Sequence, residues 1–382
     1  MAGALMSAFV ERTGVGAATG GTAAARRYLW TDAFAVRNLL ALARATGEER
    51  WTRDALALVD DVHRTLGRHR ADDPRSGWLS GLDEAEGARH PTRAGLRIGK
   101  PLPERGPDEP WDERLEWERD GQYFHYLTKW MQALDLVAHH TGRPEPADQA
   151  RELAWAATRA FVRDQGEGEL PQMVWKMSVD LSRPQVASMG HHDPLDGYVT
   201  MCQLRASAPS DGVLRDAQET YASIVAGQSL ATGDLLGLGG LLADAWRLAQ
   251  LPPRIGGSTG PVLLAVLDAA RRGLQRYAAR QAQLGSAESR LAFRELGLAR
   301  GLALVARLAG ALEAGRPPLA ELRRAPELVR ALAAHRSLGH GILAFWLRPV
   351  HRRVTSWTAH QDINDVMLAS ALLPVAEAER SG

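Results

Sequence analysis

The sequence predicts an all-α fold in which about twelve antiparallel helices close into a toroid, with long loops at its mouth. Three observations favour this fold. Apolar residues recur at helical spacing in many segments, these segments come in pairs joined by short turns, and runs of Val, Ile and Thr with two-residue alternation are nearly absent. We expect one domain over residues 1–382, in which residues 13–28 form a loose N-terminal segment.

The first pair of helices is expected over residues 31–47 and 51–67, and the second over 119–142 and 147–162. In both pairs the first helix ends at Thr-Gly, a typical end signal, and the second helix is more polar. Later helices are expected over residues 194–206, 213–228, 235–249, 261–281, 288–313, 319–334 and 362–378, and residues 3–12 can supply a twelfth. The alternation of more and less apolar helices favours a closed ring, because alternate helices would then form an inner layer covered on both sides.

Composition and charge exclude several classes of protein. The 46 basic and 45 acidic residues leave a net charge of +1, which does not favour a nucleic-acid partner. The chain lacks an apolar run of about 18 residues and a basic segment ahead of an apolar N-terminal stretch, so we expect a soluble cytoplasmic protein without a membrane partner. Cys202 is the single cysteine, which excludes an internal disulfide. The only lysines are Lys100, Lys129 and Lys176, which reflects either chance or a need for a titratable ammonium group.

Aspartates stand where most of the predicted inner helices begin. They are Asp32, Asp120, Asp193, Asp196, Asp234 and Asp362. For any one of these aspartates, its position is sufficiently explained by helix capping and by the favourable interaction of a negative charge with the helix dipole. In a closed ring, however, all inner helices begin at the same end, so these carboxylates would converge on one mouth.

Aromatic and histidine side chains are dense around the same positions. They are Trp30, Trp78, Trp111, Trp117, Tyr123, His125, Tyr126, Trp175, Tyr198, Trp357 and His360. Aromatic faces beside carboxylates suit a sugar, whose C–H face packs on a ring while its hydroxyls need hydrogen-bond partners. Two long connections, residues 68–118 and 166–193, are expected to build the walls of a pocket at the mouth.

The segment "GHHDPLDG", residues 190–197, combines two histidines with two acids. Pro194 suits the first turn of a helix with Asp193 as its N-cap. Capping does not explain His191, His192 and Asp196, which are therefore candidates for function. A metal site is not expected, because adjacent histidines project differently and no HxxxH or HExxH spacing is present.

The chain resembles the six-hairpin glycosidase superfamily, the (α/α)6 barrels, in three features taken together. These are the serial αα-hairpins, the Thr-Gly turns, and the acids with aromatics at alternate helix starts. That superfamily includes inverting glycoside hydrolases, unsaturated-uronyl hydrolases and polysaccharide lyases, and the N-acylglucosamine 2-epimerase group has a similar barrel. The resemblance implies a site in the funnel where inner helices begin, at Asp32, Asp120, His191, His192, Asp193, Asp196, Asp234 and Asp362. No subfamily fingerprint matches, and the β-sandwich of several larger hydrolase families is missing.

We therefore predict a glycoside hydrolase that acts on a small oligosaccharide or glycoside without a cofactor or metal. Asp120 and Asp196 are the preferred acid/base pair, with Asp32, Asp234 or Asp362 as alternates. The predicted substrate-binding residues are His125, His191, His192, Asp193, Trp30, Tyr123, Trp78, Trp175, Lys176, Trp357 and His360. Two alternatives stay open: a sugar isomerase or epimerase that uses histidines for proton transfer, and a carbohydrate-binding or scaffold protein without catalysis.

Overall fold

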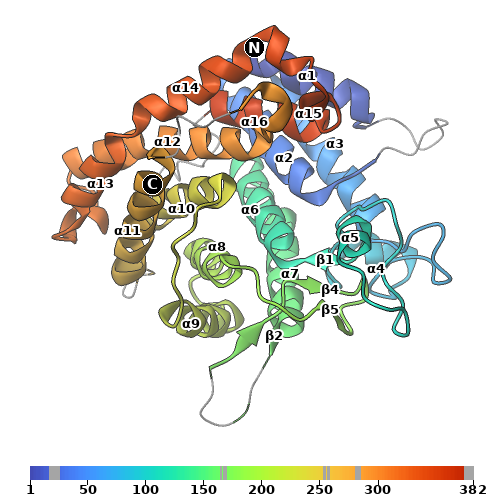
Figure 1. Ribbon diagram of the computed structural model, residues 1–382. Coiled ribbons are helices and arrows are strands. Elements are labelled where there is room, and N and C mark those ends of the chain that lie inside the picture. The colour runs from blue at the N-terminus through green and yellow to red at the C-terminus, as the bar shows by residue number, and fades with distance from the viewer. Residues whose placement is uncertain are drawn as a thin grey trace. The chain divides into compact units, whose positions relative to one another are not determined.

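The computed structural model describes residues 1–16, 26–163, 166, 170–252, 255, 259–279 and 285–373. Helices dominate these residues, and the strands are only two or three residues long, so the all-α prediction is confirmed (Figure 1). The chain divides into two compact units. The N-terminal unit is Val10–Gly227, and the C-terminal unit comprises Met1–Phe9 and Gln228–Gly382. The single domain and the closure of all helices into one toroid stay predictions.

Three helix pairs build the N-terminal unit (Figure 1). They are α2 (Leu29–Thr46) with α3 (Glu49–Leu66), α6 (Phe124–Thr141) with α7 (Glu145–Phe161), and α8 (Asp193–Ser207) with α9 (Gly212–Ala226). Each pair packs together, and α6 also contacts both α2 and α8. Helix α2 is buried on all sides from Leu29 to Ala43, whereas α3 buries a single stripe. The first helix of this pair is therefore more buried than the second, as the predicted alternation requires.

The Thr-Gly ends of α2 and α6 form as predicted. Gly47 and Gly142 adopt left-handed backbone conformations, with φ of 70° and 71°. Their amides donate to the carbonyls of Ala43 and Ala138, which satisfies helix-end acceptors. A glycine is favoured at these positions because a Cβ atom would strain the left-handed conformation.

The start predicted for α6 at residue 119 is wrong, because the helix begins at Phe124. The preceding β1 (Gln122–Tyr123) pairs with β4 (Lys176–Met177), which pairs with β5 (Pro184–Val186). A second antiparallel pair joins β2 (Val162–Arg163) to β3 (Gln172–Met173). Strands this short leave no alternating pattern in a sequence, so their pairing is decided by distant partners.

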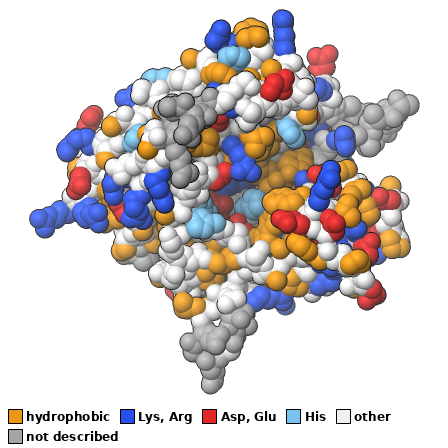
Figure 2. Space-filling model, viewed as in Figure 1, with side chains coloured by type: hydrophobic (Ala, Val, Ile, Leu, Met, Phe, Trp, Pro, Cys, Tyr) orange, Lys and Arg blue, Asp and Glu red, His pale blue; other side chains and the backbone are white. Residues whose placement is uncertain are grey.

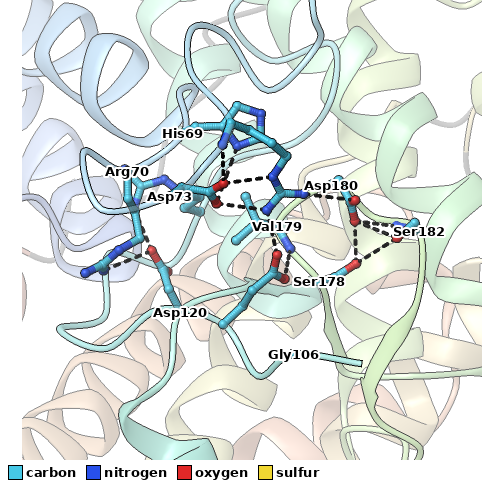
Figure 3. Close-up of polar contacts among 12 residues, drawn as sticks. His69, Arg70, Asp73, Gly106, Asp120, Ser178, Val179, Asp180 and Ser182 are labelled. Carbon is cyan, nitrogen blue, oxygen red and sulfur yellow. Dashed lines mark hydrogen bonds and ion pairs between the residues drawn. The ribbon is translucent and has the colours of Figure 1, made fainter. Parts of the chain in front are cut away.

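Arg75 joins the described parts of the two long connections to each other. Figure 3 shows two of the acids that it contacts, Asp73 of the first connection and Asp180 of the second. The first contains α4 (Glu84–Arg89) and α5 (Glu113–Glu118). The guanidinium group of Arg75 lies 2.9 Å from Asp73 and 2.8 Å from Glu104 in that connection, and 3.1 Å from Asp180 in the second. Asp180 in turn accepts hydrogen bonds from the hydroxyls of Ser178 and Ser182, both at 2.7 Å. One arginine thus holds three carboxylates that are distant in sequence.

The C-terminal unit carries the first residues of α1 (Ala2–Thr13) and the remaining helices. These are α10 (Leu235–Ala249), α11 (Thr259–Ala278), α12 (Ala292–Glu313), α13 (Ala325–Ala333), α14 (Arg336–Leu347), α15 (Thr355–Thr358) and α16 (Gln361–Leu372), with 3-10 turns at Ala287–Ser289, Leu319–Glu321 and Pro349–Arg352. Helix α12 contacts α10, α13, α14 and α16. The backbones of α10 and α12 meet at glycines, since a Cβ on Gly239 would lie 2.2 Å from the Gly297 carbonyl oxygen.

Helix α14 was not predicted, because Gly339 and Gly341 lower the helical propensity of its sequence. The predicted helix over 362–378 is observed as far as Leu372, while residues 374–378 lie outside the described residues, as do 280–281 and most of the segment 13–28. Within the described part of the chain, no helix has the length and apolar composition needed to cross a membrane.

Candidate active site in the N-terminal unit

The first turn of α8 places two carboxyl groups close together. The helix begins at Asp193, one residue earlier than predicted, so His192 and not Asp193 occupies the N-cap position. The Asp193 side chain is therefore not used for capping. It is 4% exposed, and among the described residues no donor contacts its Oδ2 atom. A buried carboxyl oxygen without a donor is unfavourable as a charged group.

The second carboxyl group, that of Asp196, is bound by a lysine. The Nζ atom of Lys129, on α6, lies 2.6 Å from Asp196 Oδ1, and both side chains are largely buried. A short charge-assisted contact of this kind stabilises the ionised carboxylate. Lys129 is one of the three lysines in the chain, but it was not among the predicted site residues.

The surroundings of Asp193 and its neighbour His125 shift both pKa values in favour of the neutral forms. Burial, reinforced by the nearby charge of Asp196, raises the pKa of Asp193 well above its ordinary value, although Lys129 acts in the opposite direction. Burial also lowers the pKa of His125 to about 4, with Asp196 raising it and Lys129 lowering it. The His125 Nδ1 atom lies 3.5 Å from Asp193 Oδ1. The imidazole is therefore neutral at neutral pH, and 31% of the His125 side chain stays exposed.

Aromatic rings connect this cluster to the short sheet of β1, β4 and β5. Trp175 stacks on Tyr123 at 4.8 Å, and Tyr123 stacks on His125 at 5.6 Å, with interplanar angles of 14° and 11°. Tyr126 packs edge-on against His125, and its hydroxyl lies 2.6 Å from that of Tyr28. One continuous group thus contains Asp193 and three of the predicted substrate-binding residues, Tyr123, His125 and Trp175.

Two predicted site residues are buried in structural roles. Asp120 is fully buried, and its carboxylate accepts from Arg97 Nη1 at 2.5 Å and from the backbone amides of Gly99 at 2.9 Å and Lys100 at 3.3 Å. Lys176 is also fully buried, with Nζ 2.7 Å from a carboxylate oxygen of Glu116 and further contacts to two carbonyl oxygens of α5 and its end. Neither side chain has a surface that a substrate can contact. The preference for Asp120 as a catalytic acid is therefore not supported by the geometry.

Three further predicted residues of this unit lie in its core. Asp32 is in the first turn of α2 and accepts from the Tyr28 amide at 3.1 Å, as expected for a helix-start acid. Trp30 packs on Phe34, and Trp78 packs under Arg68. All three predicted residues are at most 5% exposed. His191 is exposed and His192 is half-buried, with ring centres 4.5 Å apart, directly before α8.

The remaining predicted residues belong to the C-terminal unit. Asp234 caps α10 and lies 2.6 Å from Arg294 Nη1, and Asp362 is in the first turn of α16. His360 is the exposed N-cap residue of α16, and Trp357 is buried. The helix-start positions are confirmed for Asp234 and Asp362. Their convergence with the acids of the N-terminal unit stays a prediction.

Within the described ranges, no group of three or more His, Cys, Asp or Glu side chains is arranged to hold a metal ion. No known protein-family model matches the chain, and no curated protein matches its sequence significantly. The candidate site therefore stands on its own geometry: a buried carboxyl group with a raised pKa and a lysine-bound carboxyl group on one helical turn, with a neutral histidine beside them.

Proposed function

We propose that the protein is a carbohydrate-active enzyme, and that it hydrolyses a glycosidic bond at Asp193 and Asp196. The observation that carries this proposal is the pairing of a carboxyl group with a raised pKa and a lysine-bound carboxylate in the first turn of α8. Glycoside hydrolysis requires one carboxylic acid and one carboxylate, and different surroundings on neighbouring groups are the usual means of separating those roles.

In the proposed reaction, Asp193 gives its proton to the oxygen of the leaving group as the bond from that oxygen to the anomeric carbon breaks. Asp196 accepts a proton from the water molecule whose oxygen bonds to the same carbon. The reaction leaves Asp193 ionised and Asp196 protonated, and exchange with solvent restores both groups. His125, as the partly exposed neighbour of Asp193, is suited to return the proton to it.

The raised pKa of Asp193 has a consequence for the pH dependence of the reaction. A general acid is active in its protonated form, so raising its pKa extends activity toward higher pH. The rate should fall as the pH rises through the pKa of Asp193, and this fall should come at a higher pH than for an ordinary aspartic acid. The variant Asp193→Asn should lose this basic limb together with most of the activity.

The test is a screen of aryl-glycosides and oligosaccharides by mass change. We expect the wild type to cleave at least one of them, and Asp193→Asn and Asp196→Asn to lower kcat by about 100-fold or more. Asp216→Asn, at an exposed aspartate of α9, is the matched control and should leave the rate unchanged. Wild-type rates in both site variants would overturn the assignment.

A second function is favoured by one specific contact. The neutral His125 imidazole beside Asp193 is also suited to removing a proton next to a sugar carbonyl, as an isomerase or epimerase requires. In deuterated water such an enzyme would exchange substrate hydrogen, and His125→Gln would abolish the exchange. A hydrolase would show no exchange, and a non-catalytic binding protein would show neither exchange nor cleavage.

A further inference from the structure

A recess on the N-terminal unit is walled by three tryptophans that the proposed reaction does not use. It has a volume of about 420 Å³ and is lined by Trp111, Trp117 and Trp175 together with Val186 and Met189. Trp111 is 58% exposed and Trp117 is 52% exposed. Figure 2 shows hydrophobic and acidic side chains gathered over the part of this unit that carries α5. Exposed aromatic surface concentrated in one recess is typical of a binding site.

The recess adjoins the candidate active site. Gly190 lines it, and a Cβ on Gly190 would lie 2.4 Å from the Asp193 carboxyl group, so these two residues are in direct contact. Trp175 lines the recess on one side and stacks on Tyr123 on the other, and Tyr123 stacks on His125. A ligand in the recess would therefore lie next to the groups proposed to react.

Two of the three tryptophans, Trp117 and Trp175, are held in place by contacts with neighbouring residues. The Trp175 indole donates to the Ser188 hydroxyl at 3.1 Å, and its ring centre lies 5.3 Å from that of Trp117. Lys176, which we assign as a positioning residue, binds the side chain and carbonyl of Glu116 and the carbonyl of Arg119, on either side of Trp117. Rings fixed before binding lose little conformational entropy when a ligand stacks on them.

The charges around the recess favour an uncharged ligand. Its acidic side chains are Glu113, which is exposed, and Glu116, which is neutralised by Lys176 and Arg105. Among the described residues that line the recess, none is basic. An anionic sugar would meet the Glu113 carboxylate without a compensating cation, whereas a neutral sugar can pack its C–H face on the indole rings.

We propose that the Trp111, Trp117 and Trp175 recess is a subsite for a neutral sugar residue, so that the substrate is an uncharged oligosaccharide of at least two units. This inference rests on the proposed function, because it assumes that the scissile bond lies at Asp193. The volume of the recess is at the lower end of the range for small-molecule sites, which suits a single sugar residue or a short segment.

The test measures binding separately from catalysis. The full chain carrying Asp193→Asn is titrated by calorimetry and tryptophan fluorescence with neutral gluco-, manno-, xylo- and N-acetylglucosamine oligosaccharides and with oligogalacturonates. We expect one neutral series to bind, with affinity rising from the monosaccharide to the disaccharide, and oligogalacturonates to bind less tightly. Adding Trp111→Ala or Trp117→Ala should weaken binding by about ten-fold, the effect of losing one aromatic stacking contact.

Trp155→Ala is the matched control. Trp155 lies on α7, is 43% exposed and does not line the recess, so its removal should leave the affinity unchanged. The subsite is overturned if no neutral oligosaccharide binds, if the recess variants bind as tightly as Trp155→Ala, or if oligogalacturonates bind best. If neutral oligosaccharides bind through the recess but the wild type leaves every one of them unchanged, the subsite stands and the proposed catalysis fails.

Discussion

The buried His63 of α3 makes the stability of the N-terminal unit depend on pH. Trp130 Nε1 donates to His63 Nε2 at 3.1 Å, and an indole nitrogen is a donor only, so Nε2 must be unprotonated. Burial accordingly lowers the pKa of His63 from 6.5 to about 3. The unfolded chain therefore binds a proton at His63 more readily than the folded chain does. The stabilisation is complete above the unfolded pKa of 6.5 and is lost as the pH falls toward 3.

The size of this effect follows from the two pKa values. Between about pH 8 and pH 5, a shift from 6.5 to about 3 removes roughly 2 kcal/mol from the free energy of unfolding. The variant His63→Gln cannot titrate but keeps an acceptor for the Trp130 indole. It should be less stable than the wild type at pH 8, and the difference should shrink by roughly 2 kcal/mol at pH 5.

The assay is urea unfolding at both pH values, followed by circular dichroism and tryptophan fluorescence. Groups other than His63 titrate alike in the two proteins, so their contributions cancel in the comparison. If the difference between the wild type and His63→Gln is the same at pH 8 and pH 5, the neutral, buried state of His63 is refuted.

Three other predictions concern packing, the loop network and the site. In the C-terminal unit, Gly239→Ala should lower the free energy of unfolding by about 1–3 kcal/mol, because the added Cβ would collide with the α12 backbone. A Cβ on Gly240 meets nothing within 4 Å, so Gly240→Ala should leave the free energy of unfolding unchanged or raise it. Equal effects of the two substitutions in urea unfolding would contradict this. Arg75→Gln should speed limited proteolysis within residues 68–118, because three ion pairs are lost, and an unchanged cleavage rate would show that they do not hold this connection. Lys129→Met should move the acid limb of the pH–rate profile to higher pH, because the Asp196 carboxylate loses the positive charge that favours its ionised form. An acid limb that stays at the same pH would argue against Asp196 as the base.

Helices and their ends were predictable because the signals are local. The stripe of apolar residues in α3 and the glycines after α2 and α6 act within a few residues of the structure they determine. The start of α6 was not predictable in the same way. Residues 119–123 are compatible with a helix, but β1 pairs with a strand more than fifty residues later.

For the candidate site, the sequence identified the right segment and only part of its chemistry. It placed Asp193 and Asp196 at a helix start, and the scarcity of lysine drew attention to Lys129. It did not show that Lys129 contacts Asp196. It also could not distinguish Asp193, whose Oδ2 has no donor among the described residues, from Asp120, whose carboxylate accepts from Arg97 and two backbone amides.

The sequence by itself determined an all-α chain with acids at several helix starts. Only the tertiary structure decided the state of each acid. The pKa and accessibility of a carboxyl group depend on burial and on charges contributed by other elements, such as Lys129 on α6 or Arg97 in a connection. These contributions act through space between residues far apart in the chain, so the pattern around each aspartate does not contain them.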